Sequence, residues 1–343
     1  MTSHLFEPRL VNDAFGDPGL YVDFRDERRA LLVDVGDIGA LAPRSLMRLT
    51  HVFVTHTHMD HFSGFDRLLA VVLGRKERLA FLGGPGFVDQ VEHKLRAYTW
   101  NVVHRYEVEL VIEALEVGLD GHGRRASFSS RRRFDREEGG AFEPSGDVLH
   151  DEAAFRVRGR LVDHDIPCLS FAIEEKAHVR VDRDRVAGLG FTPGAWLRAL
   201  KQAVLAGAPD AAPIEVRWRD RDGEHRAVRT VGELRPVVLD VVAGRRIGYA
   251  TDLRFTEANV RALGELLAGV DVLYIESVFL DRDADQAARK NHLTARQAGT
   301  IARAVGARSI VPFHFSPRYE GRAEELRSEA LAAWKATSPP CSG

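Results

Sequence analysis

Short stretches of apolar residues, separated by polar turns, predict a chain that alternates strands and helices. Residues 20–24 and 30–34 flank a charged turn and predict a β-hairpin at the edge of a sheet. Residues 51–54 are mostly β-branched or aromatic and predict a buried strand. After Ser63, which we expect to cap a helix, apolar residues recur at helical spacing, namely Phe65, Leu68, Leu69 and Val72. This pattern is typical of an α/β protein.

Four later strands are each followed by a residue that can bind a metal or transfer a proton. The strands are predicted at 155–162, 247–251, 270–275 and 309–313, and the residues after them are His164, Asp252, Glu276 and His314. Ahead of the last strand, Thr294 and Gln297 predict a helix capping box, so His292 lies just before a helix N-terminus. That position favours contact with anions.

Two segments differ in composition from the rest of the 343 residues. Segment 118–148 lacks apolar periodicity, and its residues 121–140 hold six arginines against three acids, a local net charge of +3. We predict a mobile basic surface loop there, which is either a solvated charge run or a contact for a polyanion. Segment 176–236 contains a predicted helix and an arginine-rich strip, and we predict an inserted arm. We expect one large domain over residues 1–336 and a frayed tail at 337–343.

Composition and charge narrow the class of protein. Hydrophobic residues make up 45% and charged residues 29%, an ordinary balance for a globular protein. The formal net charge of −2 excludes a uniformly basic nucleic-acid-binding protein, so any such binding must use local patches. Cys168 and Cys341 do not suggest a disulfide framework. Because neither a signal peptide nor a long apolar run is evident, we expect a cytoplasmic protein without membrane contact.

Three histidines and one aspartate fall within the six residues His56-Thr57-His58-Met59-Asp60-His61. A continuous helix or strand cannot aim all four side chains at one point, whereas a tight loop at a strand end can. Neutral imidazole and carboxylate are usual ligands of zinc and similar ions. Four such groups are too many for one zinc ion that keeps an open position. The loop therefore predicts two metal ions, with further ligands from later in the chain.

Asp34 and His164 are candidates to complete this site. His164 lies past a strand end and before a proline turn, which fits a missing ligand. Asp34 either orients a ligand histidine or is a solvated carboxylate at a strand end, and the sequence favours neither interpretation.

With these motifs in order, the chain resembles the metallo-β-lactamase superfamily and, within it, ribonuclease Z, the endonuclease that trims the 3′ side of tRNA precursors. The superfamily resemblance rests on the histidine-rich loop followed by His164, Asp252 and His314, and it covers residues 20–320. The resemblance to ribonuclease Z rests on the motifs at 162–167, 172–176, 188–194 and 314–319, and on Glu276 with 292–294. It implies an αββα sandwich with an inserted tRNA-binding arm.

The resemblance also implies two Zn²⁺ ions, although such sites accept Mn or Fe as well. One ion would be bound by His56, His58 and His164. The other would be bound by Asp60, His61 and His314. Asp252 would bridge the two ions.

A catalytic scheme follows from the same resemblance. A water activated by the two metals would attack the phosphodiester, and Asp60 would take its proton. His292, oriented by Glu276, would protonate the leaving oxygen, and Ser316 and Arg318 would hold a phosphate oxygen. A plain alternative is a surface ion pair for Arg318 and a capping or core role for His292. The resemblance further implies a homodimer in which one subunit's arm holds the tRNA that the other cuts.

Two departures from the family pattern concern the substrate. Residues 11–19 replace the usual Gly-Thr-Gly strand motif and Pro-Thr-Arg-like turn, and Asp252 is followed by Leu253 where the family usually has threonine. We therefore expect a metal-dependent phosphodiesterase, first of all a ribonuclease Z-like endoribonuclease. The alternatives are a phosphodiesterase for a small molecule such as a cyclic nucleotide, or another hydrolase of this superfamily. Intact ligands argue against a scaffold without activity.

Overall fold

The computed structural model describes residues 4–25, 27–176, 178–221, 223–242 and 244–336. The chain forms two compact units, of which the larger comprises His4–Glu174 with the chain from Arg245 onward, and the smaller comprises Glu175–Gly244. The predicted arm, 176–236, falls within the smaller unit, whereas the predicted tail, 337–343, lies outside the described residues. No helix in the described part of the chain has the length and apolarity that a membrane span needs.

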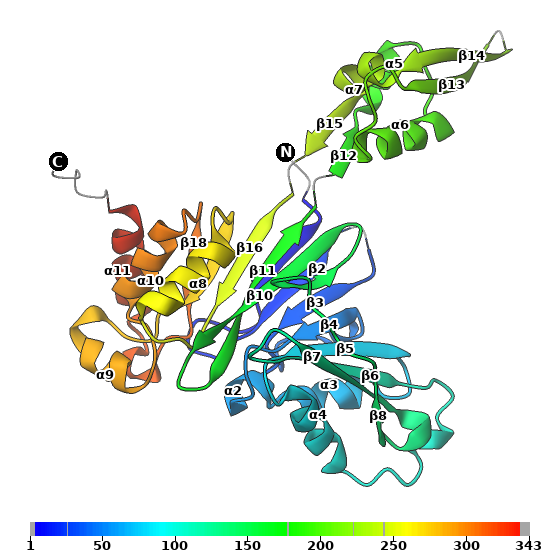
Figure 1. The fold of residues 1–343 in the computed structure, drawn as a ribbon. Coiled ribbons are helices and arrows are strands. Elements are labelled where there is room, and N and C mark those ends of the chain that lie inside the picture. The colour runs from blue at the N-terminus through cyan, green and yellow to red at the C-terminus, as the bar shows by residue number, and fades with distance from the viewer. Residues whose placement is uncertain (1–3, 26, 177, 222, 243, 337–343) are drawn as a thin grey trace. The chain divides into compact units, whose positions relative to one another are not determined.

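Two sheets face each other in the larger unit (Figure 1). The first contains, in spatial order, β1 (Phe6–Leu10), β2 (Leu20–Phe24), β3 (Ala30–Val33), β4 (Leu49–Phe53), β5 (Arg78–Gly83), β6 (Val111–Val117), β7 (Gly123–Ser129) and β8 (Arg136–Glu138). The second contains β18 (Ile310–Phe313), β17 (Val272–Glu276), β16 (Arg246–Ala250), β11 (Pro167–Glu175), β10 (Phe155–Asp163) and β9 (Val148–Asp151).

The central strands of the first sheet have apolar side chains on both faces, because successive side chains of a strand point to opposite sides. Leu31 and Phe53 pack in the core between the two sheets, where Phe171 and Tyr249 meet them from the second sheet. Leu32 packs on the opposite side, in the core beneath the helices.

Helices cover the outer face of each sheet and make four layers, as the family resemblance implies. Over the first sheet lie α1 (Pro43–Leu46), α2 (Met59–Phe62), α3 (Phe65–Val72), α4 (Phe87–Arg96) and the 3₁₀ turns η1 (Val103–Arg105) and η2 (Ser130–Arg132). The second sheet is covered by α8 (Glu257–Leu267), η3 (Asp281–Asp283), α9 (Ala284–Arg289), α10 (Ala295–Ala304), η4 (Pro317–Tyr319) and α11 (Ala323–Lys335). The apolar stripe predicted for α3 is buried, and the capping box of Thr294 with Gln297 is present.

Two local predictions near the start of the chain were wrong. The hairpin of β2 and β3 forms, but it is not at the sheet edge, because β1 pairs with β2 and β4 pairs with β3. Ser63 does not cap α3; it ends the one-turn helix α2, and Gly64 is the residue before α3. The histidine-rich segment is thus a short loop that continues into a helical turn.

The predicted mobile loop at 118–148 was also wrong, because the segment contains β7, η2 and β8. Phe128 and Phe134 reach the core, but so few apolar positions give little periodic signal. Two of its arginines pair with acids outside the basic stretch: Arg124 lies 2.8 Å from Glu116, and Arg136 lies 2.7 Å from Asp89. These pairs use acidic side chains that the local charge count did not include.

The smaller unit has its own core. The helices α5 (Arg183–Gly188), α6 (Ala195–Leu205) and α7 (Val231–Val238) pack with a hairpin of β13 (Pro213–Asp220) and β14 (Gly223–Thr230) and with the paired strands β12 (His178–Val181) and β15 (Leu239–Val242). Trp196, Leu200 and Val216 are buried together there. The predicted helix from Trp196 to Leu205 is confirmed as α6.

Candidate metal centre

The strand ends bring the predicted site residues together in the larger unit. His56 follows β4, His164 follows β10, Asp252 follows β16 and His314 follows β18. Asp252 and His314 have positive φ angles of 55° and 58°, and Asp34 has 59°. A positive φ is unfavourable for residues with a side chain, so tertiary contacts hold these turns in place.

One cluster consists of His56, His58, His164 and Asp252, and one ligand-type atom from each lies within 4.8 Å of the others. Oδ2 of Asp252 is 3.3 Å from Nε2 of His164 and 3.6 Å from Nε2 of His56. Nε2 of His56 is buried and has no hydrogen-bond partner among the described atoms. Ligands of a tetrahedral zinc ion, at bond lengths of about 2.0–2.2 Å, lie about 3.3–3.6 Å apart. The spacing therefore fits a shared ion better than it fits a hydrogen bond.

A second cluster consists of Asp60, His61 and His314. Oδ2 of Asp60 is 3.4 Å from Nε2 of His61 and 3.4 Å from Nε2 of His314. Nε2 of His61 is also 3.5 Å from Oδ1 of Asp252, and it is buried without a hydrogen-bond partner in the described part of the chain. Asp252 thus turns one carboxylate oxygen to each cluster. The seven predicted ligand residues form two adjoining clusters that are able to bind metal.

The charges of the two clusters favour a cation. Burial, with His61 nearby, lowers the pKa of His56 to about 2, so its ring is neutral and can act as a ligand. Burial also lowers the pKa of His61, but the Asp252 and Asp34 carboxylates outweigh burial and raise the pKa well above its usual value. The buried carboxylates of Asp252 and Asp34 therefore stabilise a positive charge at the position of His61.

Hydrogen bonds behind the ligands fix their orientation. Nδ1 of His61 donates to Asp34 at 3.0 Å, and Asp34 also accepts from Thr55 N at 2.8 Å and from the Tyr249 hydroxyl at 3.0 Å. Nδ1 of His164 donates to the carbonyl of Asn291 at 2.9 Å. In these two histidines Nδ1 donates a hydrogen bond, which leaves the lone pair of Nε2 able to bind a metal ion. Of the two interpretations of Asp34, the structure favours the orienting one, since Asp34 is fully buried.

Glu276 and His292 form a pair beside the clusters. Oε2 of Glu276 accepts from Nδ1 of His292 at 2.8 Å. Oε1 accepts from the backbone N–H groups of Leu293 at 3.0 Å and Leu253 at 3.2 Å, so the carboxylate cannot rotate freely. Burial lowers the pKa of His292, but the Glu276 carboxylate outweighs burial and the pKa is raised overall. His292 therefore holds its proton more firmly than a free histidine.

A cavity of about 260 Å³ opens beside this pair, and its walls include Asp60, His292, His314, Ser316 and Lys290. Sequence analysis missed Lys290, although it lies only two residues before His292. Arg318 is not among the described residues that line this cavity. Its guanidinium lies 3.7 Å from Asp283 and over the ring of Phe279, which is the ion-pair alternative considered for this residue.

Comparisons with known proteins agree with this geometry. The family model described as a beta-lactamase superfamily domain matches residues 213–315. A curated ribonuclease Z from Deinococcus radiodurans is 33% identical over 292 residues, which cover 84% of this chain and 83% of the relative. The crystal structure of the short form of human tRNase Z matches with a TM-score of 0.51 and 17% identity, covering 92% of each chain. The metallo-β-lactamase-fold protein YhfI from Bacillus subtilis matches with a TM-score of 0.52 and 15% identity, covering 96% of this chain and 93% of that one. This chain therefore belongs to the ribonuclease Z family and has the metallo-β-lactamase fold.

Proposed function

We propose that this protein is a metal-dependent endoribonuclease that cleaves tRNA precursors on their 3′ side. The observation that carries the proposal is the Glu276–His292 pair at the cavity that also holds Asp60 and His314. Phosphodiester cleavage expels an alkoxide oxygen, which needs a proton donor close to the site of attack. The extent of the match to the ribonuclease Z relative supports tRNA as the substrate.

The ligand-type side chains fit two Zn²⁺ ions. His56, His58 and His164 would hold one ion, Asp60, His61 and His314 the other, and Asp252 would contact both. Bound zinc would lower the pKa of a water molecule and offset negative charge on the phosphoryl oxygens. The unpartnered Nε2 atoms of His56 and His61 support this assignment, because a buried polar atom without a partner is costly.

The protein's own groups perform the proton transfers and the positioning. The Asp60 side chain is 41% exposed and reaches the cavity, where it takes a proton from the attacking water. His292, charged through its pairing with Glu276, protonates the leaving oxygen. Lys290 and Ser316 face the same cavity and bind the phosphate. Arg318 lies 3.7 Å from Asp283, so we assign it a smaller part in phosphate binding than Lys290 and Ser316.

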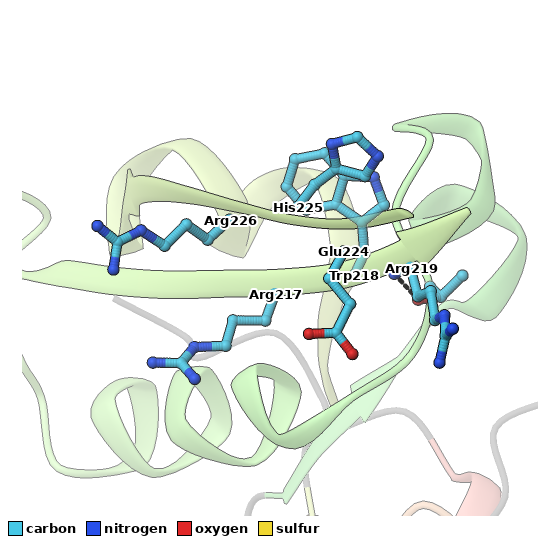
Figure 2. Close-up of a pocket in the computed structure, with 7 residues that line it drawn as sticks. Arg217, Trp218, Arg219, Glu224, His225 and Arg226 are labelled. Atoms are coloured by element: carbon cyan, nitrogen blue, oxygen red, sulfur yellow. Dashed lines mark hydrogen bonds between the residues drawn. The ribbon is translucent and has the colours of Figure 1, made fainter. Parts of the chain in front are cut away.

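The smaller unit provides the contact for a large RNA. A surface hollow of about 500 Å³ on the β13–β14 hairpin is lined by Arg217, Arg219 and Arg226, by Trp218 and His225, and by Thr192 and Glu224. Figure 2 shows these side chains. The rings of Trp218 and His225 are stacked, with centroids 5.2 Å apart. In Figure 2 the rings of Trp218 and His225 lie on one side of the hairpin, and Arg217 and Glu224 lie on the other. Arginines suit the phosphates of an RNA, and flat rings suit its bases. By family resemblance we infer a homodimer in which this unit serves the partner's centre, and we infer a cytoplasmic location.

The first experiment compares two substrates on one preparation of the full chain, whose metal content is measured. The substrates are a 3′-extended tRNA precursor and bis(p-nitrophenyl) phosphate. Cleavage of both, with at least two metal ions per chain, is the expected result. Cleavage of the small ester alone supports a small-molecule phosphodiesterase. A preparation that binds zinc and cleaves neither substrate contradicts the proposed chemistry.

A further inference from the structure

A second group of ligand-type side chains lies between the two sheets of the larger unit. His51 is in β4 of the first sheet, and His150 is in β9 at the edge of the second sheet. Their ring centroids are 4.3 Å apart. Glu152 follows β9, and one ligand-type atom from each of the three residues lies within 4.8 Å of the others. Among the described residues, this is the one such cluster that shares no residue with the candidate metal centre.

The hydrogen bonds within this cluster leave lone pairs that can bind a metal ion. Nδ1 of His51 lies 3.1 Å from the hydroxyl of Thr50, so a donated bond there leaves the Nε2 lone pair available. Oε2 of Glu152 pairs with Arg29 at 2.8 Å, and Oε1 lies 2.8 Å from Nε2 of His150. The guanidinium of Arg29 lies over the ring of Phe24, at 4.5 Å from its centroid. Arg29 thus fixes the carboxylate and leaves Oε1 turned toward the histidines.

A cavity of about 210 Å³ adjoins the cluster, lined by His51 and His150 and by the side chains of Glu113 and Arg125. Such a space, with polar groups on its wall, can hold an ion and a water molecule. Burial and the neighbouring His150 lower the pKa of His51 to about 4, so the ring is neutral at pH 7. A neutral histidine is the form that binds metal. The Glu152 carboxylate supplies the negative charge of the ligand set, and it shares that charge with Arg29 at 2.8 Å.

We propose that His51, His150 and Glu152 form an additional Zn²⁺ site, which cross-links the two sheets. Two imidazoles and one carboxylate are a known zinc donor set, and a water from the adjoining cavity completes four-fold coordination. The ion replaces the hydrogen bond between His150 and Glu152 and ties the edge strand β9 to the central strand β4. Its role is structural, and it does not depend on the reaction proposed above.

The test counts zinc ions rather than activity. Full-length wild type, His150→Gln and His122→Gln are dialysed against the same buffered free Zn²⁺ and analysed by mass spectrometry of the metal. His122→Gln is the matched control, because it removes an exposed histidine in a turn. We expect His150→Gln to hold one zinc ion fewer per chain than wild type and than the control. Equal zinc contents in all three proteins overturn the proposal.

Two further variants separate this site from the candidate metal centre and from misfolding. His61→Ala lowers the zinc content of the candidate centre, and adding His150→Gln to it removes one more ion if the sites are independent. An unchanged count in that double variant, relative to His61→Ala, rejects the additional site. If circular dichroism shows that His150→Gln is unfolded, Glu152→Gln decides, because its amide has the same shape. A folded Glu152→Gln protein that keeps the full zinc content also rejects the site.

Discussion

Nδ1 of His61 lies 3.0 Å from Oδ2 of Asp34, and neither side chain is exposed to solvent. Asp34 is held from the other side by the Tyr249 hydroxyl and by Thr55. This contact fixes the tautomer of His61, so that its Nε2 faces Asp60 and Asp252. The arrangement of the second cluster therefore depends on a residue that is not one of its candidate ligands.

Asp34→Asn is expected to weaken metal binding by about 10- to 100-fold while the protein stays folded. An amide nitrogen beside Nδ1 of His61 repels its N–H group or forces the other tautomer. The measurement is the residual zinc content after dialysis against a series of chelator concentrations. Asp37→Asn, at an exposed position three residues on, is the control. If both variants retain zinc equally, the orienting role of Asp34 is wrong.

The two clusters of candidate ligands were predictable from sequence because these residues follow strands in recognisable motifs. His56, His58, Asp60 and His61 fall within six residues, and a short loop after β4 together with the helical turn α2 brings them together. The contact of Tyr249 with Asp34 was not predictable, because a tyrosine within the apolar run of β16 looks like any core residue. Its contact with Asp34 spans 215 residues of sequence, and only the packing of the two sheets creates it.

The segment at 118–148 shows a different limit. A local charge count ignores partners from elsewhere in the chain, and Arg136 finds Asp89 and Glu92 on α4. The role of Arg318 as a phosphate contact stays a prediction, and its neighbours Asp283 and Phe279 belong to an earlier segment of the chain. Charged residues at strand edges and turns need the tertiary structure before a role can be assigned.

His292→Ala is expected to reduce turnover by about 100-fold or more, with zinc content unchanged. Asp60→Ala and His61→Ala, by contrast, are expected to lose both activity and metal. Single-turnover cleavage with metal analysis on the same samples separates the two effects. Loss of metal in His292→Ala would show that His292 is a ligand rather than a proton donor.

Glu276→Gln is expected to move the alkaline limb of the pH–rate profile to lower pH. His292 must be protonated to donate, so activity falls as pH rises through its pKa. The Glu276 carboxylate raises that pKa, and removing its charge lowers the pKa. The glutamine oxygen can still accept the backbone N–H of Leu293, which preserves the loop. An unshifted alkaline limb would mean that His292 is not the titrating acid.

Lys290→Ala is expected to raise KM about fivefold for a phosphodiester substrate, with little change in kcat. This corresponds to about 1 kcal/mol, as is usual for an exposed ionic contact. Arg318→Ala is expected to raise KM less, since Arg318 contacts Asp283 and is not among the described residues that line the cavity. Steady-state kinetics on bis(p-nitrophenyl) phosphate compare the two variants directly. The reverse order would restore Arg318 as the phosphate contact.

Trp218→Ala is expected to raise KM for the tRNA precursor by about 5- to 100-fold, because stacking of a base contributes about 1–3 kcal/mol. The same variant should cleave bis(p-nitrophenyl) phosphate at the wild-type rate, since this small ester has no nucleobase to stack on Trp218. Val228→Ala, at an exposed apolar position of β14, is the control. Equal losses on both substrates would indicate damage to the catalytic centre instead.

Glu174→Gln is expected to lower the free energy of unfolding at pH 7 by roughly 2 kcal/mol. Glu174 is buried at the end of the second sheet, and its carboxylate contacts Arg156 at 2.6 Å, Arg246 at 3.0 Å and Arg158 at 3.2 Å. The arginines are partly exposed, which limits the cost of leaving them unpaired. Urea unfolding, with Glu265→Gln as the control for an exposed ion pair, measures the difference.

The same carboxylate makes the stability of the larger unit depend on pH. Burial raises the pKa of Glu174, but the three guanidinium groups outweigh burial and lower it overall below 4.5. The unfolded chain therefore binds a proton before the folded chain does, and stability falls as pH decreases below about 4.5. Glu174→Gln has no carboxyl group to titrate, so its stability should fall less than that of wild type between pH 5 and pH 3 in urea titrations. Parallel losses in the two proteins would show that other carboxylates control acid unfolding.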